Sequence, residues 1–285
     1  TIWLSKIGDI PIRYHRSIPD NADTKEVTLK KETTGEWYVT SGFEVKDATP
    51  PEKPDVDDGN VEDCVGLDLG IQNYIYTSDG GSVDWLDLSD EYDRLRREQR
   101  SLSRKEHGSN NWEKQRREVA KIKHRIKRKV EDFQHKLTTW LIKGRDAVFV
   151  EDLNVSGMLQ QRGNARNKQD AAWRGFVEML EYKGELYGTH VVQVDPVGTT
   201  KECAECGVET EKPLWVREHS CPSCGFKADR DANASYNILS RGLQELGLGQ
   251  AESTPVETAT AVETDGGRSS SVPASRVVET GSLGA

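Results

Sequence analysis

Apolar residues along the chain follow two different periods, and these periods predict strands and helices in turn. Dense apolar runs at Cys64–Gly70, Ala147–Glu151 and His190–Val194 predict buried strands. Two shorter runs, 74–77 and 82–85, enclose an Asp-Gly-Gly turn and predict a hairpin. Strands that alternate with helical segments are typical of an α/β domain.

A spacing of three or four residues between apolar positions predicts two helices between residues 88 and 143. A break at His107–Asn110 separates them. The second helix carries the longer apolar stripe, made of Val119, Ile122, Ile126, Val130, Phe133, Leu137 and Trp140. We therefore expect a helical hairpin with one apolar seam and basic outer faces. Trp173–Tyr187 and Asn233–Leu243 predict two further helices.

The two ends of the chain differ from this central part. Residues 1–47 predict short, half-buried strands of a partial β-rich domain, and residues 48–61, rich in Pro, Asp and Gly, predict a linker. Residues 62–249 form the main predicted domain. Residues 250–285 show no period, so we expect a disordered acidic tail. The first residue is Thr and the first few already resemble part of a folded unit, so we expect a fragment that lacks its N-terminal part.

Charge is distributed unevenly over the 285 residues. The net charge is −9, but residues 91–145 carry 18 Lys and Arg against 8 Asp and Glu, a net of +10. A basic segment in an acidic protein indicates a local site for a polyanion, with a merely solvated helix face as the alternative. The residues that we expect to contact nucleic-acid phosphates are Arg116, Arg117, Lys121, Lys123, Arg125, Lys127, Arg128 and Lys129.

Four of the five cysteines form two close pairs, Cys203 with Cys206 and Cys221 with Cys224, separated by fourteen residues. Each Cys-x-x-Cys turn can direct two thiolates at one ion, and two turns complete a tetrahedral Zn²⁺ site. Four sulfur ligands leave no position for water, so this zinc would be structural, within a zinc ribbon over residues 198–228. Two disulfides are the alternative. They are disfavoured because neither a signal peptide nor a membrane-spanning run is present, and we expect a cytoplasmic protein without a membrane partner.

Three acidic residues stand at positions where burial would be costly. Asp68 lies inside the first apolar strand, Glu151 ends the second, and Asp231 opens the helix after the cysteines. A carboxylate among Val, Leu and Ile must be paired, protonated or bound to a cation. Three converging carboxylates would suit two Mg²⁺ or Mn²⁺ ions that cleave phosphodiester bonds. Each acid also has a structural alternative, as an edge residue, a loop charge or a helix N-cap, respectively.

Four motifs follow one another in the order Gly66–Ile71, Val150–Val155, the two Cys-x-x-Cys pairs and Asp229–Ile238. This order resembles the OrfB (TnpB-like) proteins of bacterial and archaeal insertion elements, which look like ancestors of the type V CRISPR nucleases. The resemblance covers roughly residues 1–246, and the motifs are specific in combination.

The resemblance implies an α/β fold with an RNase H-like, RuvC-type nuclease core, into which the helical hairpin and the zinc ribbon are inserted. It implies an RNA-guided DNA endonuclease with DNA and a guide RNA as partners, structural Zn²⁺, and catalytic Mg²⁺ or Mn²⁺. By position, Asp68, Glu151 and Asp231 match the catalytic, metal-binding acids, and Asp229 competes for the third position. Residues 1–47 resemble the end of a β-rich wedge domain that binds the guide RNA.

Members of this family carry a further N-terminal stretch with a helical recognition part, which is missing here. RNA-guided recognition needs protein surface to hold the guide–target duplex. One alternative is therefore a catalytically impaired copy that binds nucleic acid through its zinc ribbon and basic hairpin. A second is a strand-transfer transposase on the same core, which the zinc ribbon between the second and third acids disfavours.

Overall fold

The computed structural model of the chain divides into two compact units. One, here called the hairpin unit, comprises Thr1–Thr49 and Leu88–Arg128, and the other, the sheet unit, comprises Pro50–Asp87 and Lys129–Ala285. The residues that the structure describes are 1–13, 17–18, 20–46, 49–56, 62–70, 72–152, 166–213, 215–248 and 271–272. The expected disordered tail therefore lies outside the described residues except at 271–272, and so does part of the expected linker.

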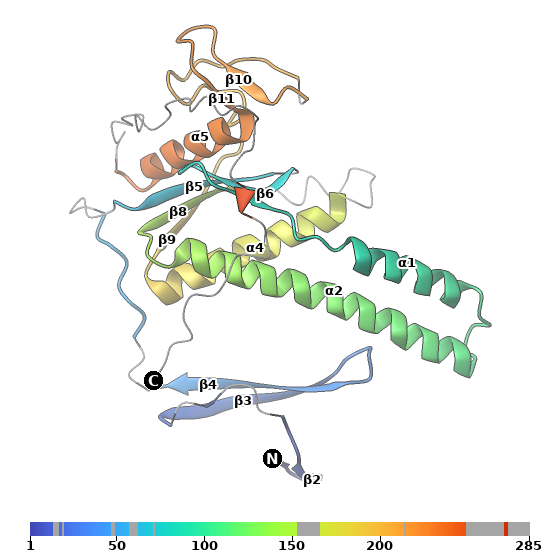
Figure 1. Cartoon of the computed structure of the whole chain (residues 1–285). Helices are drawn as coiled ribbons and strands as arrows, with labels where there is room; N and C mark the ends of the chain where they lie inside the picture. Colours follow the sequence, from blue (N-terminus) through green and yellow to red (C-terminus); the bar gives the residue numbers. More distant parts are fainter. Residues whose placement is uncertain are drawn as a thin grey trace. The chain divides into compact units, whose positions relative to one another are not determined.

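A mixed β-sheet forms the centre of the sheet unit. Its strands are β5 (Cys64–Leu69), β6 (Asn73–Thr77), β7 (Ser82–Asp84), β8 (Ala147–Glu151), β9 (His190–Val194) and the two-residue β12 (Ser271–Val272). Their order is β12-β7-β6-β5-β8-β9. Figure 1 labels four of them, β6, β5, β8 and β9. Strands β5, β6 and β7 are antiparallel, whereas β8 and β9 run parallel to β5. The first five strands end within one residue of the predicted bounds, and the α/β class is confirmed.

Helices cover both faces of this sheet (Figure 1). Helix α5 (Arg230–Glu245) lies on one face, and α4 (Arg166–Tyr187) with the C-terminal half of α2 (Asn110–Ile142) lies on the other. Apolar side chains of β5, β6 and β8 meet those of α2 and α4 in one buried cluster. A sheet that is covered on both sides explains why its central strands are continuous apolar runs.

The centre of this cluster is the aromatic ring of Tyr74 on β6. It packs edge-on against Trp85, Phe133 and Phe176, with ring centroids 4.8, 5.1 and 5.4 Å away. Its hydroxyl accepts a 2.8 Å hydrogen bond from Gln134 Nε2, so the polar end of the side chain is satisfied inside the core.

Helix α5 packs so closely on β5 and β8 that two glycines are required. A Cβ at Gly66 on β5 would lie 2.3 Å from the backbone oxygen of Ser235 on α5. A Cβ at Gly242 on α5 would lie 2.1 Å from the ring of Phe149 on β8. Neither distance is possible for a real side chain. The two glycines therefore set the height of α5 above the sheet, and with it the position of the first turn of α5.

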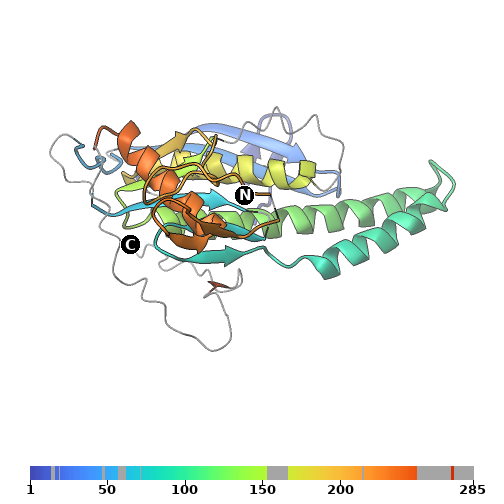
Figure 2. The ribbon, with the colours of Figure 1, turned by 90° about the horizontal axis from the view of Figure 1, so that it is seen from above.

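The hairpin unit contains two β-hairpins and the helices expected between residues 88 and 143. Its elements are β1 (Ile2–Leu4), β2 (Gly8–Ile10), β3 (Ala22–Lys31), β4 (Trp37–Val45), α1 (Ser89–Ser103) and the first half of α2. Helix α1 runs alongside α2 (Figure 2), and Gln115 Nε2 on α2 donates a 2.6 Å hydrogen bond to Glu98 on α1. The apolar seam expected between these helices includes the buried residues Leu95, Val119 and Ile122.

One residue of the predicted stripe on α2 was wrong. Trp140 is 46% exposed, whereas Leu141 is fully buried. The helix has 3.6 residues per turn, so a step of four from Leu137 to Leu141 keeps the apolar stripe on the buried face here. The predicted step of three to Trp140 places that residue off the buried face. Among the helices of the described segments, none combines the length and the apolar character that crossing a bilayer requires.

Candidate active site and metal centre

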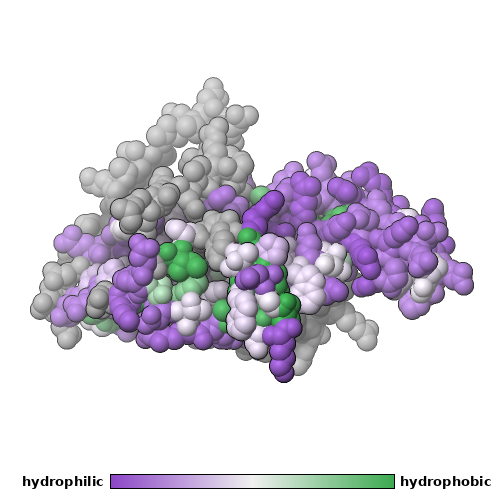
Figure 3. Space-filling model, turned by 90° about the horizontal axis from the view of Figure 1, so that it is seen from below, coloured by the Kyte–Doolittle hydropathy of each residue, from purple (hydrophilic) through white to green (hydrophobic). Residues whose placement is uncertain are grey.

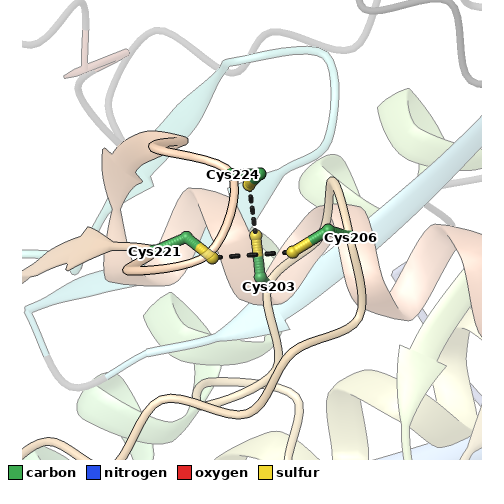
Figure 4. A group of neighbouring side chains, drawn as sticks. All are labelled: Cys203, Cys206, Cys221 and Cys224. Atoms are coloured by element: carbon green, nitrogen blue, oxygen red, sulfur yellow. Dashed lines mark hydrogen bonds between the residues drawn. The ribbon is translucent and has the colours of Figure 1, made fainter.

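The four paired cysteines converge on one point of the sheet unit (Figure 4). Their sulfur atoms all lie within 4.8 Å of one another, with 3.7 Å between Cys203 and Cys224 and 3.5 Å between Cys206 and Cys221. A tetrahedral Zn²⁺ site with bonds of about 2.3 Å places its sulfurs about 3.8 Å apart. The cluster can therefore bind a metal ion such as zinc, and none of the four cysteines forms a disulfide.

Each pair is shaped by the same backbone pattern. The first cysteine of each turn accepts a hydrogen bond at its carbonyl from the glycine four residues later, Gly207 for Cys203 and Gly225 for Cys221. Both glycines have positive φ angles, 73° and 79°, which glycine adopts at little cost. The sequence Cys-x-x-Cys-Gly therefore folds the two turns in the same way, and the sulfurs point inward because the backbone is fixed.

Backbone N–H groups already favour one thiolate. Those of Cys224 and Ser223 lower the pKa of Cys221 to about 6, because they donate to its sulfur. Burial raises the pKa of Cys203, and burial together with hydrogen bonds to the other cysteines raises that of Cys224 to about 12. Four neighbouring sulfurs cannot all ionise without a cation. This imbalance is what a bound metal would relieve, since its ligands must be deprotonated.

The three predicted acids occupy three elements of the same unit. Asp68 lies near the end of β5, Glu151 at the end of β8, and Asp231 in the first turn of α5. Their exposed fractions are 6%, 8% and 5%, so all three carboxylates are buried. The parallel pairing of β5 with β8 brings Asp68 and Glu151 together at the C-terminal ends of two neighbouring strands.

The structure brings these carboxylates into one electrostatic group. Burial raises the pKa of Asp68 well above its usual range, and the charges of Glu151 and Asp231 raise it further. Burial also raises the pKa of Glu151, where a 2.6 Å hydrogen bond from Thr199 Oγ1 opposes the effect. A Cβ at Gly70, two residues after Asp68, would lie 3.8 Å from Asp231 Oδ2.

The three carboxylates do not form a ligand group of the kind that the four cysteines form. Within the described segments, the cysteine group is the only set of three or more Cys, His, Asp or Glu side chains that is arranged to hold a metal ion. The acids therefore share a buried neighbourhood and interact electrostatically, but they do not form a closed ligand shell.

The two candidates for the third acid have different environments. Asp229 is exposed and caps α5, where its Oδ1 accepts a 2.8 Å hydrogen bond from the Asp231 N–H. Asp231 is buried, and its charge acts on Asp68 and Glu151. The N-cap role considered for Asp231 thus belongs to Asp229. Of the two, Asp231 is therefore the buried acid that interacts with Asp68 and Glu151.

Two arginines that the sequence did not single out contact Asp231. Arg217, between the two cysteine pairs, pairs through Nη2 with Asp231 Oδ2. Arg230 Nε lies 3.3 Å from Asp231 Oδ1. Both arginines partly offset the rise in the pKa of Asp68. No spacing in the sequence marks Arg217 for this role, because the contact depends on the folding of the cysteine segment.

A second set of residues, also missed from the sequence, ties the acids to the cysteine turns. Asn233 Nδ2 on α5 donates to the Glu202 carbonyl at 2.7 Å, and its Oδ1 accepts from the Ala204 N–H at 3.0 Å. Asn237, one turn later, donates to the carbonyls of Thr199 and Glu202. Asn233 and Asn237 of α5 thus hold the loop that carries both Thr199, the partner of Glu151, and Cys203.

The basic residues of α2 fall into two groups. Some have partners in the hairpin unit: Arg116 pairs with Glu113, Lys121 with Glu118, and Arg128 with the Tyr38 hydroxyl and ring. Lys127 and Lys129 also have partners.

In the part of the chain that the structure describes, Arg117, Lys123 and Arg125 are exposed and make no hydrogen bond or ion pair. Figure 3 shows a strongly hydrophilic surface over the helical pair. These three residues are therefore the ones left open to a phosphate.

Two family models match the sequence. The OrfB_IS605 model, described as "Probable transposase", matches residues 32–162. A model described as "Cas12f1-like, TNB domain" matches residues 173–238, which include the cysteine cluster and Asp231.

Several curated proteins are similar to the chain. A Streptomyces pristinaespiralis protein named "Putative RNA-guided DNA endonuclease" is 37% identical, over 87% of this chain and 60% of its own length. The "Putative RNA-guided DNA endonuclease InsQ" of Escherichia coli (strain K12) is 32% identical, over 87% of this chain and 64% of its own length. The "TnpB-like protein MJ0751" of Methanocaldococcus jannaschii is 29% identical, over 69% of this chain and 75% of its own length. These matches confirm the resemblance to the OrfB (TnpB-like) family.

The chain spans 60–64% of the length of the first two of these relatives. Among solved structures, a CRISPR-Cas12f ternary complex is similar with a TM-score of 0.46 and 18% identity, over 72% of this chain and 42% of the other.

Proposed function

Because its sequence resembles the OrfB (TnpB-like) family, we propose that this chain carries the nuclease core of an RNA-guided DNA endonuclease of an insertion element. The observation that carries the proposal is the group of three buried carboxylates on β5, β8 and α5, which interact electrostatically although they come from distant parts of the sequence. The strand order and the positions of the acids on strand, strand and helix support an RNase H-like, RuvC-type core.

In this proposal Asp68, Glu151 and Asp231 hold the catalytic metal. Their hard carboxylate oxygens suit Mg²⁺ or Mn²⁺, and their burial disfavours three uncompensated charges. Two such ions, when bound, would supply the activated water and the stabilisation of the leaving oxygen in phosphodiester cleavage. Thr199 orients Glu151 through its 2.6 Å hydrogen bond, and Asn233 fixes the loop from which Thr199 projects.

The cysteine cluster has a structural role in the same proposal. Four soft thiolates at tetrahedral spacing suit Zn²⁺, and a closed shell leaves no position for catalysis. The zinc would hold residues 198–228 as a ribbon beside α5 and would thereby position Arg217. We also propose the domain boundaries predicted from the sequence, with a partial wedge domain at residues 1–47 and the nuclease domain at residues 62–249.

The partners proposed are DNA and a guide RNA. Arg117, Lys123 and Arg125 on α2 would contact their phosphates, because these cations are exposed and have no protein partner within the described residues. Arg116, Lys121, Lys127, Arg128 and Lys129 would extend the same face, after exchange of their present partners. Relatives named as RNA-guided DNA endonucleases support this choice of partners.

A second candidate function is nucleic-acid binding without cleavage, through the zinc ribbon and the basic helices. It is favoured by one specific observation: arginines contact both oxygens of Asp231. An acid group in that state would keep the fold but would not bind catalytic metal.

The experiment that separates the two candidates is plasmid cleavage in Mg²⁺ by the chain purified with RNA transcribed from its own locus. We expect Asp68→Ala and Glu151→Ala to lower the cleavage rate at least about a hundredfold. Asp229→Ser, which keeps a helix-capping oxygen, is the matched control and should cut at the wild-type rate. Tight binding of nucleic acid without cutting by the wild-type chain would support the second candidate.

A further inference from the structure

Positive side chains occupy both oxygens of Asp231. Arg217 Nη2 contacts Oδ2, and Arg230 Nε lies 3.3 Å from Oδ1. The Asp231 side chain is 7% exposed, so solvent screens these pairs little. The arginines therefore stand where a divalent cation shared with Asp68 would need to bind this carboxylate.

Arg217 is held in this position mainly by Asp231. Its Nε is buried, and within the described residues it has no hydrogen-bond acceptor. A buried donor without an acceptor is unfavourable, so this part of the guanidinium group does not stabilise the inward position. The side chain as a whole is 31% exposed, which leaves it a route to solvent once its pairing with Asp231 is lost.

The cysteine segment brings Arg217 to the acids. Arg217 lies between Cys206 and Cys221, just before β10 (Glu218–Ser220), and its carbonyl accepts from the Arg230 N–H. Strand β10 pairs with β11 (Lys227–Asp229), which leads directly into α5. The backbone that follows the first cysteine pair is thus tied to the first turn of α5.

More than one positive group gathers on this side of the segment. Burial and the charge of Arg230 lower the pKa of Lys212, while the charges of Asp229 and Asp231 oppose that effect. Arg230 and Arg217 in turn moderate the repulsion between Asp68 and its two acidic neighbours. The positive charges of these side chains therefore partly neutralise the three carboxylates, as a bound divalent ion would do.

From this arrangement we infer that Arg217 is an internal counter-ion, held by the cysteine segment, which competes with the divalent metal for Asp231 and so sets the metal affinity of the carboxylate site. The inference rests on the proposed function, since it assumes that the three acids bind metal. Arg217 acts through Asp231 and is therefore a positioning residue in this account. The cysteine cluster would then control the acids through one side chain as well as through the fold.

The test is a calorimetric titration of Mn²⁺ into the zinc-loaded full chain, without nucleic acid. Removal of one positive charge beside a divalent ion should tighten binding at least about tenfold, so we expect that gain for Arg217→Gln. Arg217→Lys keeps the charge and should stay near the wild-type affinity. Lys227→Gln removes a charge from an exposed position on β11 and is the matched control. Unchanged or weaker binding by Arg217→Gln would overturn the inference.

A measurement on the wild-type chain keeps the inference testable even when Arg217→Gln does not fold. With ¹⁵N-labelled arginine, the buried Nε–H of Arg217 should exchange slowly with water in the absence of divalent ions and much faster after Mg²⁺ addition. Persistent slow exchange in saturating Mg²⁺ would overturn the inference.

The outcome also distinguishes this inference from the proposed function. If Mn²⁺ binding is lost in Asp68→Asn but is indifferent to Arg217→Gln, only the counter-ion role fails. If the wild-type chain binds no Mn²⁺ through these acids, the proposed nuclease function fails with it.

Discussion

The cysteine cluster and the carboxylate group belong to the same unit, yet opposite constraints organise them. The four cysteines lie within one short segment, and backbone hydrogen bonds aim their sulfurs at one point to within 4.8 Å. The three acids come from β5, β8 and α5, and their spacing depends on how closely α5 packs on the sheet. The first site is local and nearly closed, whereas the second is assembled by the fold and remains open.

The two sites also differ in which neighbouring groups favour or disfavour the ionised side chains. Among the cysteines, backbone N–H groups lower the pKa of Cys221, whereas the pKa values of Cys203 and Cys224 are raised. Among the acids, burial and mutual repulsion disfavour the ionised form of Asp68, and two arginines beside Asp231 partly offset this effect. The cysteine site should therefore depend on its metal for folding, and the acid site should respond to changes in charge.

The largest expected effect comes from opening the cysteine cluster. Cys221→Ser removes one of four ligands, and because structural zinc supplies folding free energy of roughly 10–16 kcal/mol in small zinc domains, residues 198–228 should lose their order. Metal analysis should fall from about one zinc per chain to none, with new protease cleavage in this segment. Cys64→Ser, on β5 and outside the cluster, should keep the zinc. A stable, protease-resistant Cys221→Ser chain would contradict the zinc role.

A smaller but still large effect is expected where α5 meets the sheet. Gly66→Ala places a methyl group 2.3 Å from the Ser235 carbonyl, so α5 must move, at a cost of about 1–3 kcal/mol or more. The same shift would displace Asp231. Gly175→Ala, in helix α4 with its nearest neighbour at 3.9 Å, is the control and should be neutral or slightly stabilising. Equal denaturation midpoints for both variants would argue against the close packing.

The loop that joins the two sites offers a third test. Asn233→Ala leaves the Ala204 N–H and the Glu202 carbonyl with fewer partners, which should lower the free energy of unfolding by about 1–3 kcal/mol. Because this loop carries Thr199, metal binding at the acids should weaken as well. Gln244→Ala, on the exposed face of α5, should change neither property. Urea denaturation and Mn²⁺ titration of both variants measure the two effects.

The smallest expected effect is a change in how stability depends on pH. Because burial and neighbouring acids raise the pKa of Asp68, the folded chain retains its proton to higher pH than the unfolded chain does. The contribution of protonated Asp68 to the free energy of unfolding is complete below the ordinary carboxyl pKa of about 4. This contribution is lost as pH rises through the raised pKa. Asp68→Asn should therefore melt at a higher temperature than the wild type at pH 8 without divalent metal.

This advantage should shrink at pH 4, and each kcal/mol should shift the midpoint by about 2–4 °C. A higher melting temperature for the wild type at pH 8 would contradict the direction of the pKa shift. Addition of Mg²⁺ should reverse the order, because only the wild-type chain can use the ion.

Much of this arrangement could be predicted from the sequence where the signal was local. The apolar runs located β5, β8 and β9, and the Cys-x-x-Cys pairs located the cysteine cluster, because each depends on a few consecutive residues. The Trp140 position failed because one step of three or four decides which face of a helix a residue occupies. Whether Asp229 or Asp231 caps α5 depends on where the helix begins, which the pattern placed three residues late.

Other features could not be found in this way. The contacts of Arg217 with Asp231 and of Thr199 with Glu151 join segments far apart in the chain. They depend on the height of α5, which two glycines set, and a lone glycine in a sequence does not say what packs against it. The sequence marked the acids, but the cations that balance them are a property of the fold.

The most direct test of the central claim is a crystal of the chain soaked in Mn²⁺ and measured at the zinc and manganese absorption edges. We predict one zinc peak among the four sulfurs and a manganese peak at an ion coordinated by Asp68, Glu151 and Asp231. The Arg217 side chain should then be displaced from Asp231. Manganese absent from these acids at saturating concentration, or bound at Asp229 in their place, would contradict the account.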